Sequence, residues 1–168
     1  MTLAELMANV TINPDYEGIL TNDDNVLAIN INGDAGADDI GSYAVVQGAI
    51  VGVDAQMNPV VQDKQYIRAG LSSTKTGAQR TFKSTGDRMI GDDYQDFVFA
   101  HKRKYGVGNE VIVKYVWFCM LNGKGETGKV SIIVNSDGSG NAGETAGIDV
   151  DLRKSGDAPE EFTYTPEP

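Results

Sequence analysis

The sequence EVIVKYVWFCML runs from Glu110 to Leu121, and its residues alternate between two sets, as the two-residue period of a β-strand requires. Both sets are apolar: one holds Val111, Val113, Tyr115, Trp117, Cys119 and Leu121, and the other holds Ile112, Val116, Phe118 and Met120, interrupted by Lys114. A strand whose two faces are both apolar must be covered on both sides. The pattern therefore predicts a long strand buried within a larger β-structure.

The segments after this strand also favour β-structure. We expect a turn at Asn122–Gly128 followed by a strand at Lys129–Val134, and a glycine-rich turn at Asn135–Thr145 followed by a strand at Ile148–Leu152. An extended tail is expected at Ser155–Pro168. The tail contains three prolines and four acidic residues, a composition typical of an extended segment.

One helix is predicted before the long strand. It begins after an acidic N-cap at Gly91-Asp92-Asp93, and Gly106 follows its end. The apolar positions at helical spacing are Tyr94, Phe97, Val98, His101 and Tyr105. Three basic residues occupy the last turn, where positive charge complements the helix dipole: Lys102, Arg103 and Lys104.

The first half of the chain is less regular. Residues 1–25 are expected to form an N-terminal arm, and Asn32–Gly41, with Asp34, Asp38 and Asp39, an acidic loop. Strands are expected at Val26–Ile31, Tyr43–Val53, Gln65–Leu71 and Gln79–Thr85, with a loop at Asp54–Gln62 and a turn at Ser72–Gly77. The order of strands, one helix and strands predicts one mainly β domain over residues 1–168, a β-sandwich or barrel with a single packed helix.

The loop predicted at Asp54–Gln62 is unusually apolar for a surface segment. It contains Met57, Pro59, Val60 and Val61, which favours cover by a neighbouring subunit. We therefore take these four residues as candidate contacts between subunits. The basic residues Lys102, Arg103 and Lys104 are taken as candidate contacts too. They could complement the helix C-terminus, pair with an acidic neighbour or bind nucleic acid.

The overall charge argues against binding nucleic acid. The net charge is −10, so the chain should repel phosphate unless its basic residues gather on one face. Cys119 is the only cysteine, which excludes an intrachain disulfide. The first residues include Glu5 and lack a basic segment, so they do not resemble a secretory signal. The apolar run Tyr115–Leu121 is far shorter than the ~20 residues of a membrane span, so no membrane is expected as a partner.

Several weak motifs favour turns over chemistry. Gly123–Lys129 has the glycine and lysine spacing of a phosphate-binding loop, but Val130 stands where the magnesium-binding hydroxyl belongs, and no helix follows. Asp137–Glu144 resembles part of a calcium loop but is too short. His101, the only histidine, is expected to pack on the apolar stripe of the helix. The sequence thus predicts no enzyme, no cofactor and no metal site.

Parts of the chain, from about Val53 onward, resemble tail tube (major tail) proteins of long-tailed bacteriophages. The segments that carry this resemblance are Tyr66–Gly70, Thr74–Phe82, Gly86–Arg88, Gly91–Phe97, Gly123–Lys129, Asp137–Glu144 and Phe162–Tyr164. Their order around one helix is more specific than any single segment. Residues before Gly41 do not take part in it.

The resemblance implies a subunit of the virion tail that is assembled in the host cytoplasm. Six such subunits form a ring in which their sheets join into a continuous barrel, and rings stack into a tube. The implied partners are further copies of the chain, a tape-measure protein, a tail terminator and baseplate proteins. DNA passes through the lumen without specific binding, which suits an acidic subunit. We expect the Asp54–Gln62 loop and the N-terminal arm to make contacts between rings.

Two alternatives remain open at this point. Within the same fold, the chain could be the tube subunit of a phage-derived bacteriocin or of a contractile secretion system, which only the surrounding machinery would distinguish. From a different class, it could be a monomeric β-sandwich module that binds a carbohydrate or a cell-surface ligand. The small number of aromatic residues in the predicted loops disfavours this second alternative.

Overall fold

The computed structural model describes residues 1–33 and 38–166, and its secondary structure is mainly β, as the sequence predicts. Residues 34–37, within the acidic loop predicted at Asn32–Gly41, and residues 167–168 of the predicted tail lie outside the described part. The strands are β1 (Asn25–Ile29), β2 (Ala44–Val45), β3 (Ile50–Gln56), β4 (Pro59–Tyr66), β5 (Gly70–Ala78), β6 (Thr81–Asp87), β7 (Ile112–Cys119), β8 (Lys124–Ser139), β9 (Gly147–Lys154) and β10 (Glu160–Thr163). The helices are α1 (Leu3–Met7), α2 (Asp93–Val98) and α3 (His101–Tyr105), with short 3₁₀ helices at Asn22–Asp24, Ile40–Ser42 and Gly108–Val111.

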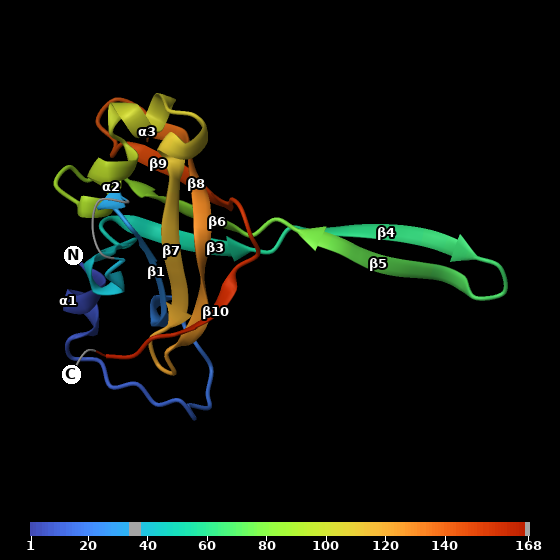
Figure 1. Cartoon of the computed structure of the whole chain (residues 1–168). Helices are drawn as coiled ribbons and strands as arrows, with labels where there is room; N and C mark the ends of the chain where they lie inside the picture. Colours follow the sequence, from blue (N-terminus) through green and yellow to red (C-terminus); the bar gives the residue numbers. More distant parts are fainter. Residues whose placement is uncertain (34–37, 167–168) are drawn as a thin grey trace.

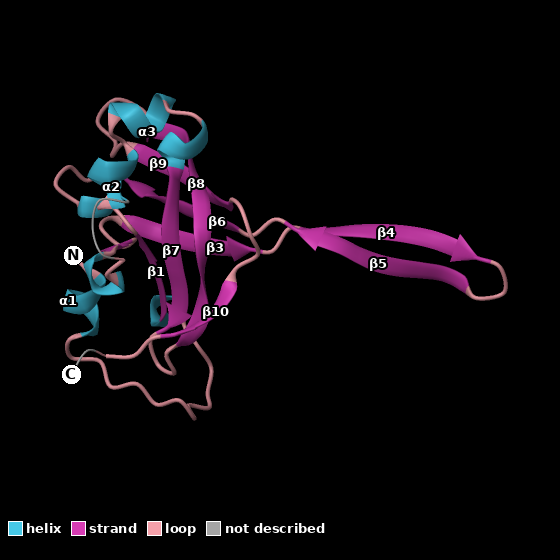
Figure 2. Ribbon diagram, viewed as in Figure 1, coloured by secondary structure: helices cyan, strands magenta, loops and turns pink. Residues whose placement is uncertain are grey.

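Eight strands form one antiparallel sheet in the order β2-β1-β7-β8-β9-β6-β3, with β10 also paired to β8. The long strand β8 makes the sheet continuous, because its first half pairs with β7 and its second half with β9. The sheet curls through β8, and its two halves face each other around a core (Figure 2). The sandwich expected from the sequence is thus a single sheet folded over itself.

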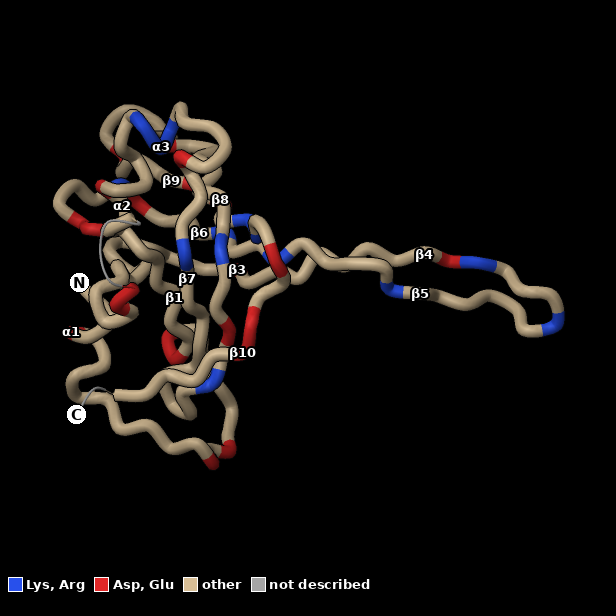
Figure 3. The backbone as a smooth tube through the Cα atoms, in the orientation of Figure 1, with Lys and Arg blue, Asp and Glu red and all other residues tan. Residues whose placement is uncertain are grey.

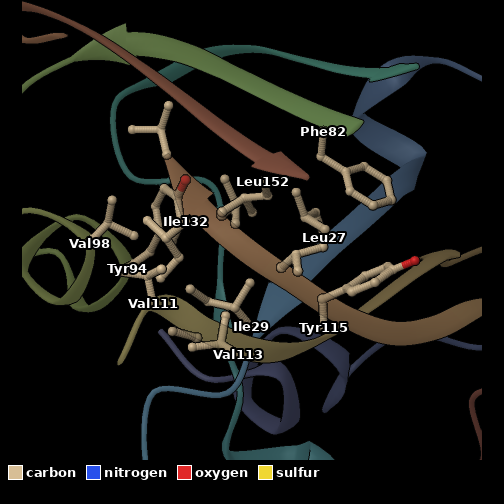
Figure 4. Close-up of a cluster of buried hydrophobic side chains, with 14 of the residues drawn as sticks. Leu27, Ile29, Phe82, Tyr94, Val98, Val111, Val113, Tyr115, Ile132 and Leu152 are labelled. Atoms are coloured by element: carbon tan, nitrogen blue, oxygen red, sulfur yellow. The ribbon is translucent and has the colours of Figure 1, made fainter. Parts of the chain in front are cut away.

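The predicted long strand is β7, and both of its faces are buried. Val113 and Tyr115 point into the core between the two halves of the sheet, together with Leu27, Phe82 and Leu152 (Figure 4). At ~25 cal/mol per Å² of apolar surface, this cluster is the main source of the domain's stability. The expectation that both faces are covered is confirmed, and the cover comes from the chain itself.

The opposite face of β7 is covered by the two ends of the chain. Val116 and Phe118 pack against Leu3 and Met7 of α1, and Phe162 from β10 joins them. Helix α1 begins with a capping box, in which Thr2 and Glu5 bond each other's backbone N–H groups. The start of the predicted arm and part of the predicted tail therefore pack on the sheet, while residues 13–21 remain irregular and exposed.

The predicted helix is divided into two short ones. Asp92 caps α2 as expected, since its carboxylate accepts a hydrogen bond from the Gln95 backbone N–H at 3.0 Å. Ala100 has a ψ of 140°, which ends the helical period before α3 begins. As a result His101 does not continue the apolar stripe: it is exposed, and its ring lies beside that of Tyr105 with centroids 4.8 Å apart.

The region between Tyr43 and Ala78 differs most from prediction. The strand expected at Tyr43–Val53 is interrupted after Val45 by a turn in which Ala49 has a φ of 54°. The loop expected at Asp54–Gln62 belongs largely to strands β3 and β4, with only Met57 and Asn58 between them. The expected strand Gln65–Leu71 contains the turn between β4 and β5, and the expected turn Ser72–Gly77 lies within β5.

The side chain of Gln95 joins α2 to two neighbouring loops. It is fully buried, and its amide donates to the carbonyls of Gly48 and Asp87 at 2.7 and 2.9 Å. Its carbonyl accepts from the backbone N–H of Met89 at 2.8 Å. All three backbone groups would lose their partner if this side chain were removed.

We expect Gln95→Ala to lower the free energy of unfolding by about 2–4 kcal/mol, because buried backbone groups are left unsatisfied. Urea denaturation followed by circular dichroism measures this loss. Gln65→Ala on the exposed face of β4 is the matched control and should change stability by less than about 0.5 kcal/mol. Equal losses in the two variants would contradict the role assigned to Gln95.

Candidate assembly surface

The outstanding surface feature is a hairpin formed by β4 and β5, which projects from the body of the molecule (Figure 1). The two strands pair from Pro59↔Ala78 to Tyr66↔Gly70, and all of β4 and almost all of β5 is exposed. A two-stranded hairpin exposed on both faces is only marginally stable in water. Its length therefore suggests a surface that is completed by contact with another chain.

The tip of the hairpin, which we define as Tyr66–Leu71, is apolar around one basic residue. Tyr66 is 49%, Ile67 91% and Leu71 69% exposed, and it is such a group of exposed apolar side chains, rather than a single one, that marks an interaction surface. Arg68 lies in the turn with a φ of 66°, the left-handed region that non-glycine residues rarely adopt. Tight hairpin turns commonly require this conformation, and Arg68 is the central one of the three residues between β4 and β5, so it lies at the apex.

The base of the hairpin is anchored on the core through Arg80. Its Nε lies 2.8 Å from Oε1 of Glu126, which also accepts a hydrogen bond from the Tyr115 hydroxyl at 2.9 Å. The Arg80 guanidinium lies over the ring of Phe82, 4.6 Å from its centroid, and donates to the sulfur of Met57. Burial of Tyr115, with the negative charge of Glu126 beside it, raises the pKa of the Tyr115 hydroxyl and keeps it a neutral donor. The base of the hairpin is thus held to the core by a largely buried arginine.

We expect Arg80→Met to destabilise the domain by about 1–3 kcal/mol, because it leaves the carboxylate of Glu126 without its cation in a partly buried site. The same substitution at Arg68, which forms no ion pair within the described part of the chain, is the control. Chemical denaturation of both variants at equal concentration makes the comparison. A loss in Arg80→Met no larger than in Arg68→Met would show that the anchor contributes nothing.

Charge is distributed unequally between the hairpin and the body. Residues 57–79 contain Lys64, Arg68 and Lys75 against Asp63, a net charge of +2, so the rest of the chain carries −12. Figure 3 shows the corresponding basic positions along the hairpin and most of the acidic positions on the body. A basic projection and an acidic body are complementary surfaces for association between copies.

The candidate contacts chosen from the sequence fall into two groups that the structure separates. Met57, Pro59, Val60 and Val61 lie at the base of the hairpin and are all exposed. Helix α3, which carries Lys102–Lys104, lies at a different end of the body (Figure 1). Three residues of the tip are not among the contacts expected from the sequence: Tyr66, Ile67 and Leu71. The sequence predicts a strand there. The sequence feature that could have identified them as a hairpin tip is a short apolar group between two polar segments of similar length.

Two of the three basic residues of α3 are engaged within the chain. Lys104 lies 2.8 Å from Asp137, which raises the pKa of the lysine and lowers that of the carboxyl. The guanidinium of Arg103 stacks on Phe97 at 4.5 Å and donates to the carbonyl of Glu110. Lys102 is exposed, and it stays a candidate contact with a neighbour.

The two weak sequence motifs lie partly within strand β8, which takes in Lys124–Lys129 of the first and Asp137–Ser139 of the second. The turn expected at Asn122–Gly128 is therefore wrong for residues 124–128: the chain turns at residues 120–123 instead. Gly123 has a φ of 73°, and Gly125 faces the backbone of Trp117 and Phe118 so closely that a Cβ atom would clash. Gly128, the second glycine of the spacing, lies against the Tyr115 ring, which a Cβ atom would approach to 3.2 Å, so local packing accounts for this glycine. Within Asp137–Glu144, the Glu144 carboxylate accepts from the Asn141 backbone N–H at 2.9 Å and closes a turn.

Among residues 1–33 and 38–166, no three His, Cys, Asp or Glu side chains gather in a way that could hold a metal ion. Cys119 is buried. None of the helices in the same part of the chain combines the length and hydropathy of a membrane-spanning helix.

No protein-family model matches the chain, and no curated protein sequence is similar to it. Solved structures do match. A chain from the tail of an empty gene transfer agent particle, determined with C6 symmetry, superposes with a TM-score of 0.57 at 13% identity, covering 87% of this chain and all of that one. A chain from the virion of a native gene transfer agent gives a TM-score of 0.53 at 10% identity, covering 86% of this chain and all of that one.

The protein therefore shares its fold with a chain from the tail of a gene transfer agent particle. The superposition includes most of this chain, so the likeness extends over the domain and not over one motif. The fold that the sequence resemblance implies is confirmed in this sense.

Proposed function

We propose that the chain is a structural, non-catalytic subunit that polymerises as stacked hexameric rings into a tail tube, the conduit for DNA ejection. The observation that carries this proposal is the fold shared with the tail of a gene transfer agent, combined with a long hairpin left exposed on a single copy. A tube subunit needs surfaces that only neighbouring copies complete, and the hairpin is such a surface.

The hairpin takes the role first assigned to an Asp54–Gln62 loop. Met57, Pro59, Val60 and Val61 at its base, together with its tip, make contacts between rings. The irregular segment 13–21 of the N-terminal arm is exposed and contributes to the same stacking contacts. The exposed Lys102 pairs with an acidic residue of a neighbouring copy.

The acidic balance of the body suits a channel for DNA. Basic walls would bind phosphates and slow the passage of the strand, whereas acidic walls repel them. In the assembled tail, the tube encloses a tape-measure protein and ends at a terminator and a baseplate. Subunits accumulate in the host cytoplasm before they assemble into the virion tail.

Negative-stain microscopy of the purified chain over a wide concentration range tests the proposal. We expect rings or tubes of uniform diameter, with sixfold symmetry in end-on class averages. An extract that contains assembled tails supplies seeds if nucleation is slow. A chain that stays monomeric at the highest concentration, with and without an extract containing assembled tails as seeds, would favour the binding-module alternative.

A further inference from the structure

The hairpin tip has the composition of a ligand for a surface that is both apolar and acidic. Ile67 and Leu71 are largely exposed, and Arg68 lies between them at the apex. Arg68 takes part in no ion pair within residues 1–33 and 38–166, although the chain as a whole has an excess of carboxylates. The tip therefore presents one unpaired cation surrounded by apolar side chains.

A groove on the body has the complementary composition. It has a volume of about 650 Å³ and lies between α1, the β10 segment and residues 38–41. Met7, Ile40 and Phe162 contribute apolar surface, and Asp38 and Asp39 are the only charged residues among its described lining. No basic side chain lines this part of the groove.

The two carboxylates differ in their availability. Asp38 is bound by the ammonium group of Lys114 and the hydroxyl of Tyr43, which lower its pKa. Asp39 accepts one hydrogen bond, from the Gly41 backbone N–H at 2.9 Å, and has no ion pair within the described part of the chain. It is exposed, so Asp39 is the carboxylate that can receive a guanidinium from outside.

The positions of tip and groove exclude an intramolecular contact. The hairpin projects from one side of the body, whereas α1 and the C-terminal end lie on the opposite side (Figure 1). A tip that cannot reach its own groove can reach the groove of the next copy. Contacts between two different surfaces are heterologous, and they repeat from copy to copy along a ring or filament.

We propose that the hairpin tip of one copy docks in the α1–β10 groove of a second copy. Arg68 pairs with Asp39, while Ile67 and Leu71 pack against the apolar wall of the groove. The occupant is a second copy because this chain itself carries the complementary charge and apolar tip. This inference rests on the proposed self-assembly and names the two surfaces that join.

Charge reversal tests the pairing. Arg68→Glu and Asp39→Arg should each raise the concentration needed for polymerisation by about tenfold or more, and together they should restore it to within about threefold of the parent. Light scattering on the full-length chain measures these thresholds. Lys75→Glu, the same charge change elsewhere on the hairpin, should have an effect below about threefold. Asp39→Asn removes the charge and keeps an acceptor for the Gly41 N–H, so it should raise the threshold less than Asp39→Arg, which also adds repulsion.

Unchanged assembly of either reversed variant would overturn the pairing. So would a double variant that assembles no better than the singles, provided that circular dichroism shows all of them folded. High salt should weaken assembly of the parent more than that of the variants, because the ion pair is screened.

Disulfide trapping tests proximity without requiring tubes. In a Cys119→Ala background, Ile67→Cys protein is mixed with Ala8→Cys protein, whose altered residue lines the groove. Oxidation should give a heterodimer only when both variants are present, since a disulfide needs Cα atoms within about 7 Å. Val51→Cys on the exposed edge strand β3 replaces Ile67→Cys as the control and should not cross-link.

The two experiments separate this inference from the proposed function. Cross-linking without tubes would support the docking and count against the tube. Tubes that form without cross-linking, and with unaltered assembly of Arg68→Glu, would support the tube and overturn the docking.

Discussion

Excision of the β4–β5 hairpin is expected to abolish polymerisation and leave a folded monomer. The design is set by the structure, because the backbone N–H of Gln79 donates to the carbonyl of Asn58 at 3.2 Å. Residues 59–78 can therefore be replaced by Asn-Gly, which connects β3 to β6 through a two-residue turn. These strands already pair up to Gln56↔Thr81, so their register is unchanged.

The monomer should keep its stability because the hairpin adds almost nothing to the core. All of β4 and nearly all of β5 is exposed, so the free energy of unfolding should change by less than about 1 kcal/mol. Assembly should fail at any concentration at which the parent forms tubes, because the contact surface is gone. Sedimentation and electron microscopy measure assembly, and thermal unfolding measures the fold.

A substitution series supplies the control. Thr74→Ser and Gln62→Asn change exposed residues of the same hairpin conservatively and should leave assembly intact. Normal tubes from the excised chain would show that the hairpin is not the joining element. Loss of folding would show that it belongs to the core.

The parts of the fold that could be predicted are those in which burial places apolar residues at a regular spacing along the sequence. Strand β7 has a regular two-residue period because each of its faces packs against other residues. Tyr115 belongs to the core cluster on one face and Phe118 to the cluster on the other. The N-cap at Asp92 could be predicted because an Asp that stands after a glycine and directly before an apolar helical pattern has the side chain that N-caps favour.

The hairpin could not be predicted in the same way. Its strands have no buried face, so the pattern from Pro59 to Ala78 lacks the alternation that identifies a strand. The apolar tip then looked like a strand, and the Ser/Thr-rich β5 looked like a turn. The apolar residues Val60 and Val61 were still recognised as unusual for the surface, which is why part of the candidate surface was found.

The N-terminal helix was missed for a different reason. Thr2 and Glu5 have the spacing of a capping box, which was the available signal. The helix has five residues, too few for a periodic pattern to develop. The helix is stabilised when Leu3 and Met7 pack against Val116 and Phe118 of β7. This contact is distant in the sequence, so the local sequence does not reveal it.

Removal of the C-terminal segment is expected to destabilise the domain by about 3 kcal/mol, although the sequence suggests only an extended tail. Strand β10 pairs with β8 from Glu160↔Thr127 to Thr163↔Lys124. The ring of Tyr164 stacks on Phe118 with centroids 5.2 Å apart, and the ring of Phe162 lies 5.8 Å away on the same residue. Their loss would expose Phe118, which is now 1% accessible, and would remove two aromatic contacts.

Truncation after Ala158 tests this expectation against truncation after Thr165, which removes only residues 166–168 and keeps β10 and both rings. Urea denaturation should show the large loss only in the first variant. Phe162→Ala with Tyr164→Ala in the full-length chain should reproduce most of that loss, because the rings and not the chain length provide the cover. Equal stability of the two truncated chains would mean that α1 alone protects Phe118, and that the C-terminal segment is available for contacts between subunits instead.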